Sequence, residues 1–307
     1  MPKNIISFDV GATKTRVGLL TEDYKIIKKE TFATPKKAKE ILSLIYQEIE
    51  NFRSFGEIKK IGLGIAGQID LKKRLVNFGP NFSQELKNIP LEKILEKKFK
   101  KPTAIDNDAH CFSLGEALAG HGKKYNFILG VTLGTGIGGG IIIDKKILRG
   151  KDNIAGEIGH QIIEINGRQC GCGKKGCWEA YASGMAMIKS YHKITGKNKN
   201  ALEIQKDFLN NKKESKEAVE QTANYLAIGL SNLINILNPE VIILGGGLSN
   251  FKEFIELAKK EVKKIVLTPD LQKTPILISK LGDDAGLIGA ALLNEKSKFQ
   301  IPNNKPR

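Results

Sequence analysis

The stretch NIISFDVGATKTRVGLL, residues 4–20, decides the fold. An apolar run leads to Asp9, a short glycine-containing turn follows, and a second apolar run completes the stretch. This order predicts a β-hairpin whose turn brings backbone close to a ligand. The order recurs in FILGVTLGTGIGGGIIID, residues 127–144, where we expect strands at 127–133 and 141–144 around a glycine-rich turn. Two such hairpins predict an α/β protein with two related halves and a cleft between them.

The other elements follow from apolar spacing and turn residues. The longest is a helix at about 214–237, whose apolar residues have helical spacing and which ends before Asn238-Pro239. Shorter helices are expected at about 36–52, from 107, from 178, within 201–211 and at 285–293, and strands at 60–65, 103–106 and 241–244. Residues 150–176, rich in Gly, Cys and charge, are expected to form a long loop, and the tail from 302 is expected to fray.

Composition limits the class of protein. The chain has 307 residues, a length typical of two domains, and its hydrophobic fraction of 41% excludes wholesale disorder. No apolar run approaches the roughly 20 residues of a membrane span, and the start of the chain does not resemble a signal peptide. We therefore expect a soluble, cytoplasmic protein that does not bind membranes. The net charge of +16 comes from lysines scattered among glutamates, which favours a solvated basic surface over a nucleic-acid patch.

The glycine-rich turns indicate phosphate binding. Gly134, Gly136 and Gly139 formally match the dinucleotide fingerprint, but that fingerprint requires a following helix and here a strand is expected. A P-loop sequence is also missing from the chain. The turns can instead bind phosphates through backbone N–H groups and the hydroxyls of Thr13 and Thr135. Ordinary tight turns without a ligand are the alternative.

Two acidic positions fit phosphoryl transfer. Asp9 ends the first strand beside a turn that carries Lys14, so its carboxylate can orient hydrated Mg²⁺ on a nucleotide; a turn-capping Asp is the alternative. Asp106-Asn107-Asp108 marks a strand-to-helix junction, where one such residue is an ordinary N-cap and three exceed that need. We predict that Asp108 is the general base that accepts an alcohol proton and that Asn107 holds a substrate hydroxyl.

The strongest local signal is a metal-ligand set in the long loop. His160, Cys170, Cys172 and Cys177 make a closed four-ligand zinc site of the structural kind, with reduced free thiols as the alternative. One histidine and no recognition helix exclude a nucleic-acid zinc finger. Glu157 and Glu179 flank these ligands and are suited to bind vicinal hydroxyls of a sugar, or else to form exposed salt bridges. The separate Cys111 is expected to be a buried structural thiol.

Together these motifs resemble the ROK family (repressor, open reading frame, kinase), and in particular its ATP-dependent sugar kinases. The resemblance covers almost the whole chain in family order. It is carried by Asp9-Val-Gly-Ala-Thr-Lys14, Asn107-Asp108-Ala109, Leu133 to Gly140, Ala155-Gly-Glu-Ile-Gly-His160, Cys170 to Glu179, Ser183-Gly184, Pro239 to Gly247 and Gly286 to Ala291. The Cys-x-Cys-Gly-x2-Gly-Cys-x-Glu segment after Gly-His is the most specific of these.

The resemblance implies an actin-like, ribonuclease-H-type fold with two α/β domains. We place a small domain at 1–108, completed by the C-terminal helix at about 285–307, and a large domain at 109–284 that carries the zinc loop. By the same likeness, the hexose contacts Asn81, Asn107, Asp108, Glu157, His160 and Glu179. The nucleotide faces Asp9, Gly11, Thr13, Lys14, Thr135, Gly136, Gly245, Gly246 and Gly247. Dimers are common in the family, so the likeness implies a homo-oligomer, a dimer or a tetramer.

This chain departs from the family pattern at three places. Ala12 replaces a usual glycine, His110 stands where Asn is common, and the segment 80–86 lacks the usual Trp. The expected activity is transfer of the γ-phosphoryl group of Mg·ATP to the 6-hydroxyl of a hexose, glucose being favoured. Kinases for fructose, mannose or an N-acetylhexosamine, polyphosphate as donor, a sugar-responsive transcriptional regulator and a non-catalytic zinc-held binding module are the alternatives.

Overall fold

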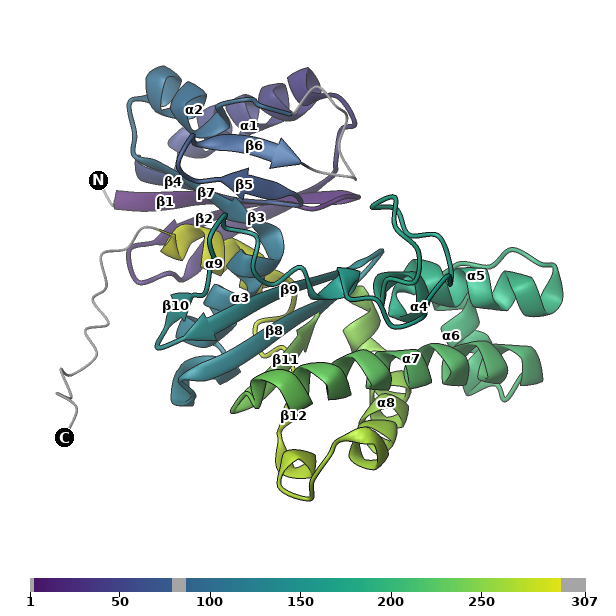
Figure 1. Ribbon diagram of the computed structural model, residues 1–307. Coiled ribbons are helices and arrows are strands. Elements are labelled where there is room, and N and C mark those ends of the chain that lie inside the picture. Colours follow the sequence, from purple (N-terminus) through teal and green to yellow (C-terminus); the bar gives the residue numbers. More distant parts are fainter. Residues whose placement is uncertain (1–2, 79–86, 294–307) are drawn as a thin grey trace, which may run out of the picture. The chain divides into compact units, whose positions relative to one another are not determined.

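The computed structural model describes residues 3–78 and 87–293 (Figure 1). The predicted sugar ligand Asn81 and the predicted frayed tail lie outside these residues. The chain divides into two compact units. Unit 1 comprises residues 1–127, 140–155 and 283–307, and unit 2 comprises residues 128–139 and 156–282. These units do not coincide with the division at residue 108, which stays a prediction.

Unit 1 is built on a five-stranded sheet of order β3-β2-β1-β4-β7. Its strands are β1 Lys3–Val10, β2 Lys14–Thr21, β3 Ile26–Ala33, β4 Glu57–Ile65 and β7 Thr103–Asn107. Strands β1 and β2 pair antiparallel, which confirms the first predicted hairpin, whereas β1, β4 and β7 run parallel. A small separate sheet pairs β5 Gln68–Asp70 with β6 Leu75–Phe78.

Helices cover both faces of the sheet in unit 1 (Figure 1). One face packs a continuous apolar core against α1 Ala38–Arg53 and α2 Leu91–Phe99. The other face receives α9 Ala285–Leu292, which approaches so closely that a Cβ at Gly62 would lie 2.1 Å from the carbonyl oxygen of Ala290. Glycine at position 62 therefore lets the helix lie directly on the strand.

Helix α3, Asp108–Ala119, packs against α9 through small residues. A Cβ at Gly289 would lie 1.7 Å from the carbonyl oxygen of Cys111, and one at Gly115 would lie 2.2 Å from that of Ala285. This close packing is the reason that α3 belongs to unit 1. The Cys111 side chain is fully buried, which confirms the predicted structural thiol.

The second five-stranded sheet has the order β10-β9-β8-β11-β12. Its strands are β8 Phe127–Leu133, β9 Ile137–Ile143, β10 Lys146–Ile147, β11 Val241–Gly245 and β12 Ile276–Ile278. The prediction that the strand after the glycine-rich turn begins at 141 was wrong, because β9 starts at Ile137. Glycine is needed inside this strand, since a Cβ at Gly139 would lie 2.6 Å from the carbonyl oxygen of Gly156.

The helices of unit 2 gather around the long α7, Lys213–Leu237 (Figure 1). It ends as predicted, with Asn238 in the left-handed region before Pro239. The neighbouring helices are α4 Glu179–Ala182, α5 Gly184–Thr195, α6 Ala201–Leu209 and α8 Lys252–Ile265. Helix α8 was not predicted, and the expected loop at 150–176 contains only a short 3₁₀ turn, Ile158–His160, and isolated bridges.

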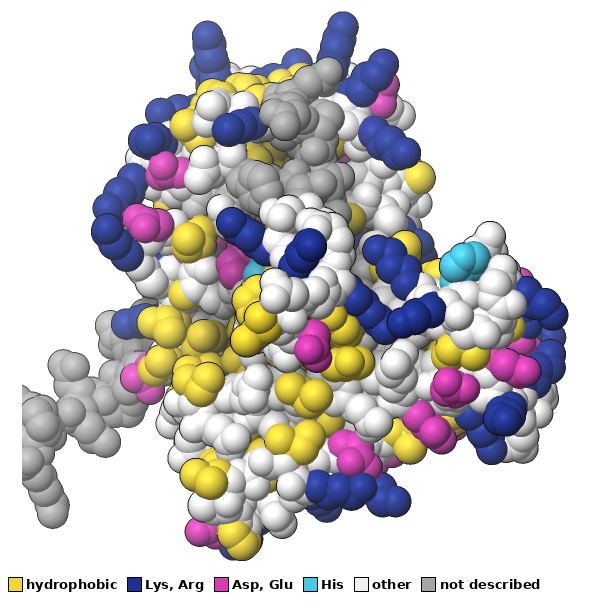
Figure 2. Space-filling view, turned by 45° about the vertical axis from the view of Figure 1, so that its right-hand side comes forward, with side chains coloured by type: hydrophobic (Ala, Val, Ile, Leu, Met, Phe, Trp, Pro, Cys, Tyr) yellow, Lys and Arg dark blue, Asp and Glu magenta, His cyan; other side chains and the backbone are white. Residues whose placement is uncertain are grey.

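The charge distribution agrees with a solvated basic surface. On the face that Figure 2 shows, Lys and Arg side chains are dispersed among Asp and Glu. Many are paired along one helix, as Lys259 with Glu256 and Lys264 with Glu261. None of the helices in the described parts of the chain combines the length and hydropathy that a membrane crossing requires.

Candidate functional site

Two carboxylates of unit 1, Asp9 and Asp108, lie at one edge of its sheet. Asp9 lies near the end of β1 and Asn107 ends β7, with β4 between these two parallel strands. Asp108 follows immediately as the first residue of α3. Because the carboxyl ends of parallel strands meet at the same edge, Asp9 and Asp108 lie at one edge of the sheet, and their roles in phosphoryl transfer stay predictions.

Burial and neighbouring negative charge raise the pKa values of these two carboxyl groups, Asp9 acting on Asp108 and Asp283 acting on Asp9. The pKa of Asp108 is raised to about 7, mainly by loss of solvent and next by the negative charge of Asp9. The pKa of Asp9 is raised to about 6, again mainly by burial, although Arg16 opposes the rise through an ion pair at 3.4 Å. A carboxylate with a pKa near neutrality is suited to general base catalysis.

Asn107 is the N-cap of α3. Its Oδ1 accepts hydrogen bonds from the N–H groups of Ala109 at 2.9 Å and His110 at 3.2 Å, and its Nδ2 donates to the carbonyl of Gly67 at 3.1 Å. Asn107 is therefore the residue of the Asp106-Asn107-Asp108 segment that serves as an ordinary N-cap. Its contact with a substrate hydroxyl stays a prediction.

The turn between β1 and β2 is stabilised by two hydrogen bonds at Gly11. The N–H of Gly11 donates to the carbonyl of Lys14 at 3.0 Å, and the hydroxyl of Thr34 donates to the carbonyl of Gly11 at 2.8 Å. The side chains of Thr13 and Lys14 are left exposed. This leaves a hydroxyl and a cation accessible beside Asp9, the arrangement expected for nucleotide phosphates.

In unit 2, the two remaining glycine turns lie at the same sheet edge. Strands β8 and β11 are parallel neighbours, with Gly245 opposite Thr132. Gly246 has φ +82°, and a Cβ there would lie 2.4 Å from the carbonyl oxygen of Leu133. The structure thus brings the predicted nucleotide residues of this unit together, namely Thr135, Gly136, Gly245, Gly246 and Gly247.

The predicted metal ligands form one cluster. The ligand atoms of His160, Cys170, Cys172 and Cys177 all lie within 4.8 Å of one another. The Sγ atoms of Cys172 and Cys177 are 3.6 Å apart, and Cys170 Sγ is 3.8 Å from His160 Nδ1. These separations match the edges of a tetrahedron with bonds of about 2.0–2.3 Å, so the residues fit a zinc ion.

The surroundings of the cluster also fit a metal. The second imidazole nitrogen, His160 Nε2, is 3.9 Å from a carboxylate oxygen of Glu157, so a carboxylate lies near the nitrogen that a ligating histidine leaves free. Trp178 follows the last cysteine, is fully buried, and donates its indole N–H to the carbonyl of Tyr225 in α7 at 2.8 Å. The loop is therefore attached to the longest helix directly after its last ligand.

Glu179 links this cluster to the glycine turn of unit 2. Its Oε2 accepts a hydrogen bond from the N–H of Ile137 at 2.8 Å, and its Oε1 lies 3.6 Å from Cys170 Sγ. A Cβ at Gly136 would lie 2.1 Å from the same carboxylate. Sugar binding by Glu157, His160 and Glu179 stays a prediction.

A buried polar network in the same strand-to-helix junction as Asp108 was not predicted from the sequence. Asp106 is completely buried and pairs with His110 and with Arg149. Arg149 also donates to Asn153 Oδ1 at 2.7 Å, and Asn153 Nδ2 donates to the carbonyl of Ile69 at 3.0 Å. The departure of His110 from the family pattern was the one available signal.

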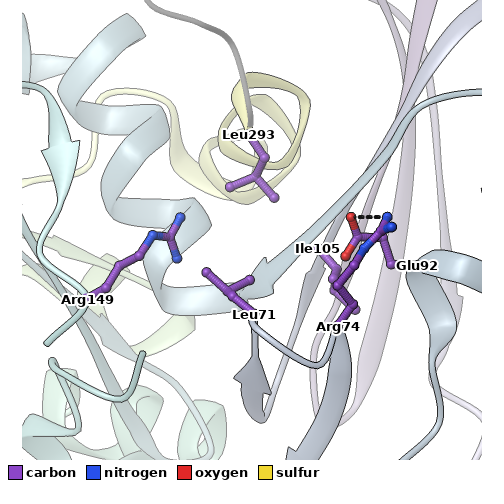
Figure 3. Close-up of a pocket in the computed structure, with 6 residues that line it drawn as sticks. All are labelled: Leu71, Arg74, Glu92, Ile105, Arg149 and Leu293. Carbon is purple, nitrogen blue, oxygen red and sulfur yellow. Dashed lines mark hydrogen bonds and ion pairs between the residues drawn. The ribbon is translucent and has the colours of Figure 1, made fainter. Parts of the chain in front are cut away.

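Arg149 also lines a cavity of about 230 Å³ within unit 1 (Figure 3). Arg74 lies across the cavity and is held by Glu92 at 2.6 Å. Three apolar residues complete the lining, Leu71, Ile105 and Leu293. Both arginines already have carboxylate partners, so the cavity offers no unpaired cation to an anionic ligand among the described residues.

The fold is that of actin-like α/β proteins. The carboxylates and the glycine turns described above are of the kind that binds nucleotide phosphates. The chain belongs to the ROK family, whose model matches residues 5–297. It is 35% identical to a glucokinase of Thermotoga maritima, over 95% of this chain and 97% of that protein. It is 36% identical to an N-acetyl-D-glucosamine kinase of Vibrio parahaemolyticus, over 94% of this chain and 99% of that protein.

Solved structures agree with this assignment. A ROK family glucokinase from Streptomyces griseus, crystallised with glucose and AMPPNP, superposes with a TM-score of 0.86 at 29% identity, covering 94% of this chain and 98% of that chain. A ROK family transcriptional regulator superposes with a TM-score of 0.83 at 22% identity, which shows a shared fold alone. The predicted family and fold class are therefore confirmed.

Proposed function

We propose that the protein is an ATP-dependent hexose kinase that phosphorylates the 6-hydroxyl of glucose. The observation that carries the proposal is Asp108, a partly buried carboxylate with a pKa of about 7 that lies at the same sheet edge as Asp9 and the turn containing Lys14. The named relatives at 35–36% identity are sugar kinases, which supports the same chemistry.

In the proposed reaction, Asp108 accepts the proton of the sugar hydroxyl. The hydroxyl oxygen forms a bond to the γ-phosphorus while the bond between that phosphorus and its bridging oxygen breaks, and ADP leaves. Asp9 would hold the hydrated Mg²⁺ of the nucleotide, and this ion supplies neutralising charge on the phosphates. Thr13, Lys14 and the backbone N–H groups of the glycine turns contact the phosphate oxygens.

Sugar selection is assigned to Asn107, Glu157, His160 and Glu179, together with Asn81. Carboxylates and an amide can pair with several hydroxyls, and an analogue that lacks one hydroxyl would leave a polar group unpaired. We further propose that zinc in the four-ligand cluster holds Glu157, His160 and Glu179 in place. The fit of the ligand atoms within 4.8 Å supports this role.

A sugar panel tests the proposed function. kcat/KM is measured for glucose, N-acetylglucosamine, mannose, N-acetylmannosamine and fructose, with ATP and then with polyphosphate as donor. Glucose with ATP is expected to have the highest value. A preference for N-acetylglucosamine would reassign the substrate, as the Vibrio relatives suggest. No phosphorylation of any hexose would refute the kinase.

The pH dependence of the rate follows from Asp108. This carboxyl group must be ionised to accept a proton, and its pKa in the free protein is raised to about 7. kcat/KM for the sugar should therefore rise about tenfold per pH unit below pH 7 and level off above it. Initial rates between about pH 5.5 and pH 9 at saturating ATP measure this profile. A rate that is constant across the acidic half would contradict Asp108 as the base.

A cytoplasmic location, a glycolytic role and a homo-oligomeric state stay predictions, as does the expectation that the protein binds neither nucleic acid nor membranes. A gel-shift assay at several salt concentrations tests the first of these expected absences, because electrostatic binding to DNA weakens steeply with salt. Sedimentation of the purified protein tests the oligomeric state.

A further inference from the structure

His110 is enclosed by hydrogen-bond acceptors at both ring nitrogens. Its side chain is buried, with 3% of the residue exposed. Nδ1 lies 2.9 Å from Asp106 Oδ1, and Nε2 lies 2.9 Å from the carbonyl oxygen of Ala155. A carbonyl oxygen can only accept, so Nε2 carries a proton.

The state of Asp106 decides whether Nδ1 carries a proton too. Asp106 Oδ1 also accepts the N–H of Asn107 at 2.8 Å, and Oδ2 pairs with the guanidinium of Arg149. The N–H of Asn107 and the guanidinium of Arg149 can only donate, which favours an ionised Asp106, and the pKa of this carboxyl group is lowered by His110 and Arg149 despite its burial. With Asp106 ionised, Nδ1 is placed to donate as well, which requires a doubly protonated ring.

The charged groups around the ring are consistent with this state. Burial lowers the pKa of His110, Asp106 on β7 and the carbonyl of Ala155 raise it, and Arg149, from the segment after β10, lowers it. On its own helix, Asp108 is a further negative group, whose pKa the positive charge of His110 lowers. The net result for His110 is a raised pKa.

The ring joins the start of α3, which carries Asp108, to the turn that precedes Glu157. On one side, His110 lies in the first turn of α3, two residues after Asp108. On the other side, it binds Ala155, whose own N–H donates to the carbonyl of Arg149 at 3.2 Å and closes the 149–155 turn. Gly156 follows with φ +100°, where the chain passes from unit 1 to unit 2, and Glu157 comes next.

We propose that His110 is a positioning residue, an imidazolium that stays charged at neutral pH, ties the start of α3 to the 149–155 turn and thereby places Asp108. Its effect on catalysis rests on the proposed function, whereas its charge state does not. A neutral imidazole carries a single N–H, so it can donate to only one of the two acceptors. The other acceptor, Asp106 or Ala155, would then be buried without its partner.

The charge state is tested by nuclear magnetic resonance of nitrogen-15-labelled histidine. The chain contains four histidines, and the spectrum of His110→Gln identifies the signals of residue 110. Both ring nitrogens of His110 should remain protonated at about pH 8, where a free imidazole is neutral. A single protonated nitrogen at that pH would overturn the proposal, whether or not the protein phosphorylates a sugar.

The positioning role is tested by kinetics of the same variant. His110→Gln should lower kcat about 10- to 100-fold, because a small misplacement of a catalytic group has that effect, with KM for ATP changed less than about threefold. His192→Gln, at an exposed histidine, is the matched control and should keep the parental kcat. An unchanged kcat in His110→Gln would refute positioning.

A second variant covers the case in which His110→Gln does not fold. Asp106→Asn keeps an oxygen acceptor for Nδ1 but removes the negative charge that favours the imidazolium. In this variant His110 should lose one ring proton at least one pH unit lower than in the parent, about a tenfold change in its protonation equilibrium. The same titration of His110 in both proteins would contradict the charge pairing proposed here.

Discussion

Asp108→Asn is expected to lower kcat by about 10²- to 10⁴-fold, the usual contribution of a general base. The amide keeps the size of the side chain, and its Oδ1 can still accept the N–H of Ala109, which Asp108 accepts at 2.9 Å. It cannot take a proton from a sugar hydroxyl. KM for the sugar should change little, because the hydrogen-bonding reach of the side chain is retained.

The same substitution should stabilise the protein, which separates a catalytic defect from misfolding. The folded-state pKa of Asp108 is about 7, above its ordinary value of 3.8, so the folded state binds more protons between these values. The stability contributed by this group is therefore lost as the pH rises through that window. Asp108→Asn removes the ionised form and its repulsion by Asp9, so Tm at pH 8 should equal or exceed that of the parent.

Asp270→Asn is the matched control, because Asp270 is highly exposed and pairs with Lys273 on the surface of unit 2. It should leave both kcat and Tm unchanged. Coupled assays at saturating glucose and ATP, together with thermal unfolding, measure the three proteins. If Asp108→Asn kept more than a tenth of the parental kcat, another group would have to accept the proton.

Local sequence patterns predicted the elements that position the site. The β1–β2 hairpin, the N-cap at the start of α3 and the end of α7 at Asn238 depend on neighbouring residues, and each is present. The start of β9 was misplaced because a run of glycines is typical of a loop. In this strand the glycines serve close packing, which involves Ile158 and Gly156, far along the chain.

The site features that local patterns did not predict depend on contacts between segments that are distant in the sequence. The cysteine spacing predicted the grouping of the His and Cys side chains, because three of the four lie within eight residues. The pairing of Asp106 with Arg149 joins residues 43 apart, and no local pattern predicts it. The pKa of Asp108 likewise depends on its burial and on Asp9, so the sequence indicated a candidate base but not its protonation behaviour.

Removal of zinc is expected to have the largest effect on stability. The loop at 150–176 has little regular structure, so the ion would supply much of its order through His160, Cys170, Cys172 and Cys177. Purified protein should contain about one zinc ion per chain, as metal analysis would measure. A strong chelator should lower Tm and abolish activity, and added zinc should restore both. Protein without zinc and with full activity would contradict the assignment.

Cys172→Ser tests the same site without a chelator. Cys172 is partly exposed, whereas Cys177 is fully buried, so this substitution removes a ligand with little loss of packing. Loss of about 4 kcal/mol of metal binding would lower Tm by about 10 °C in a protein of this size. Lys174→Ser, an exposed change in the same loop, is the control and should leave Tm within about 1 °C.

The kinetic pattern of Cys172→Ser distinguishes a role in the site from a purely structural one. Glu179 joins Cys170 to the N–H of Ile137 in the glycine turn, so disorder of the cluster should spread to both the sugar residues and the nucleotide turn. KM should therefore rise for glucose and for ATP, each by about 10-fold or more. Normal KM values in the folded fraction would mean that the cluster stabilises the loop without positioning Glu179.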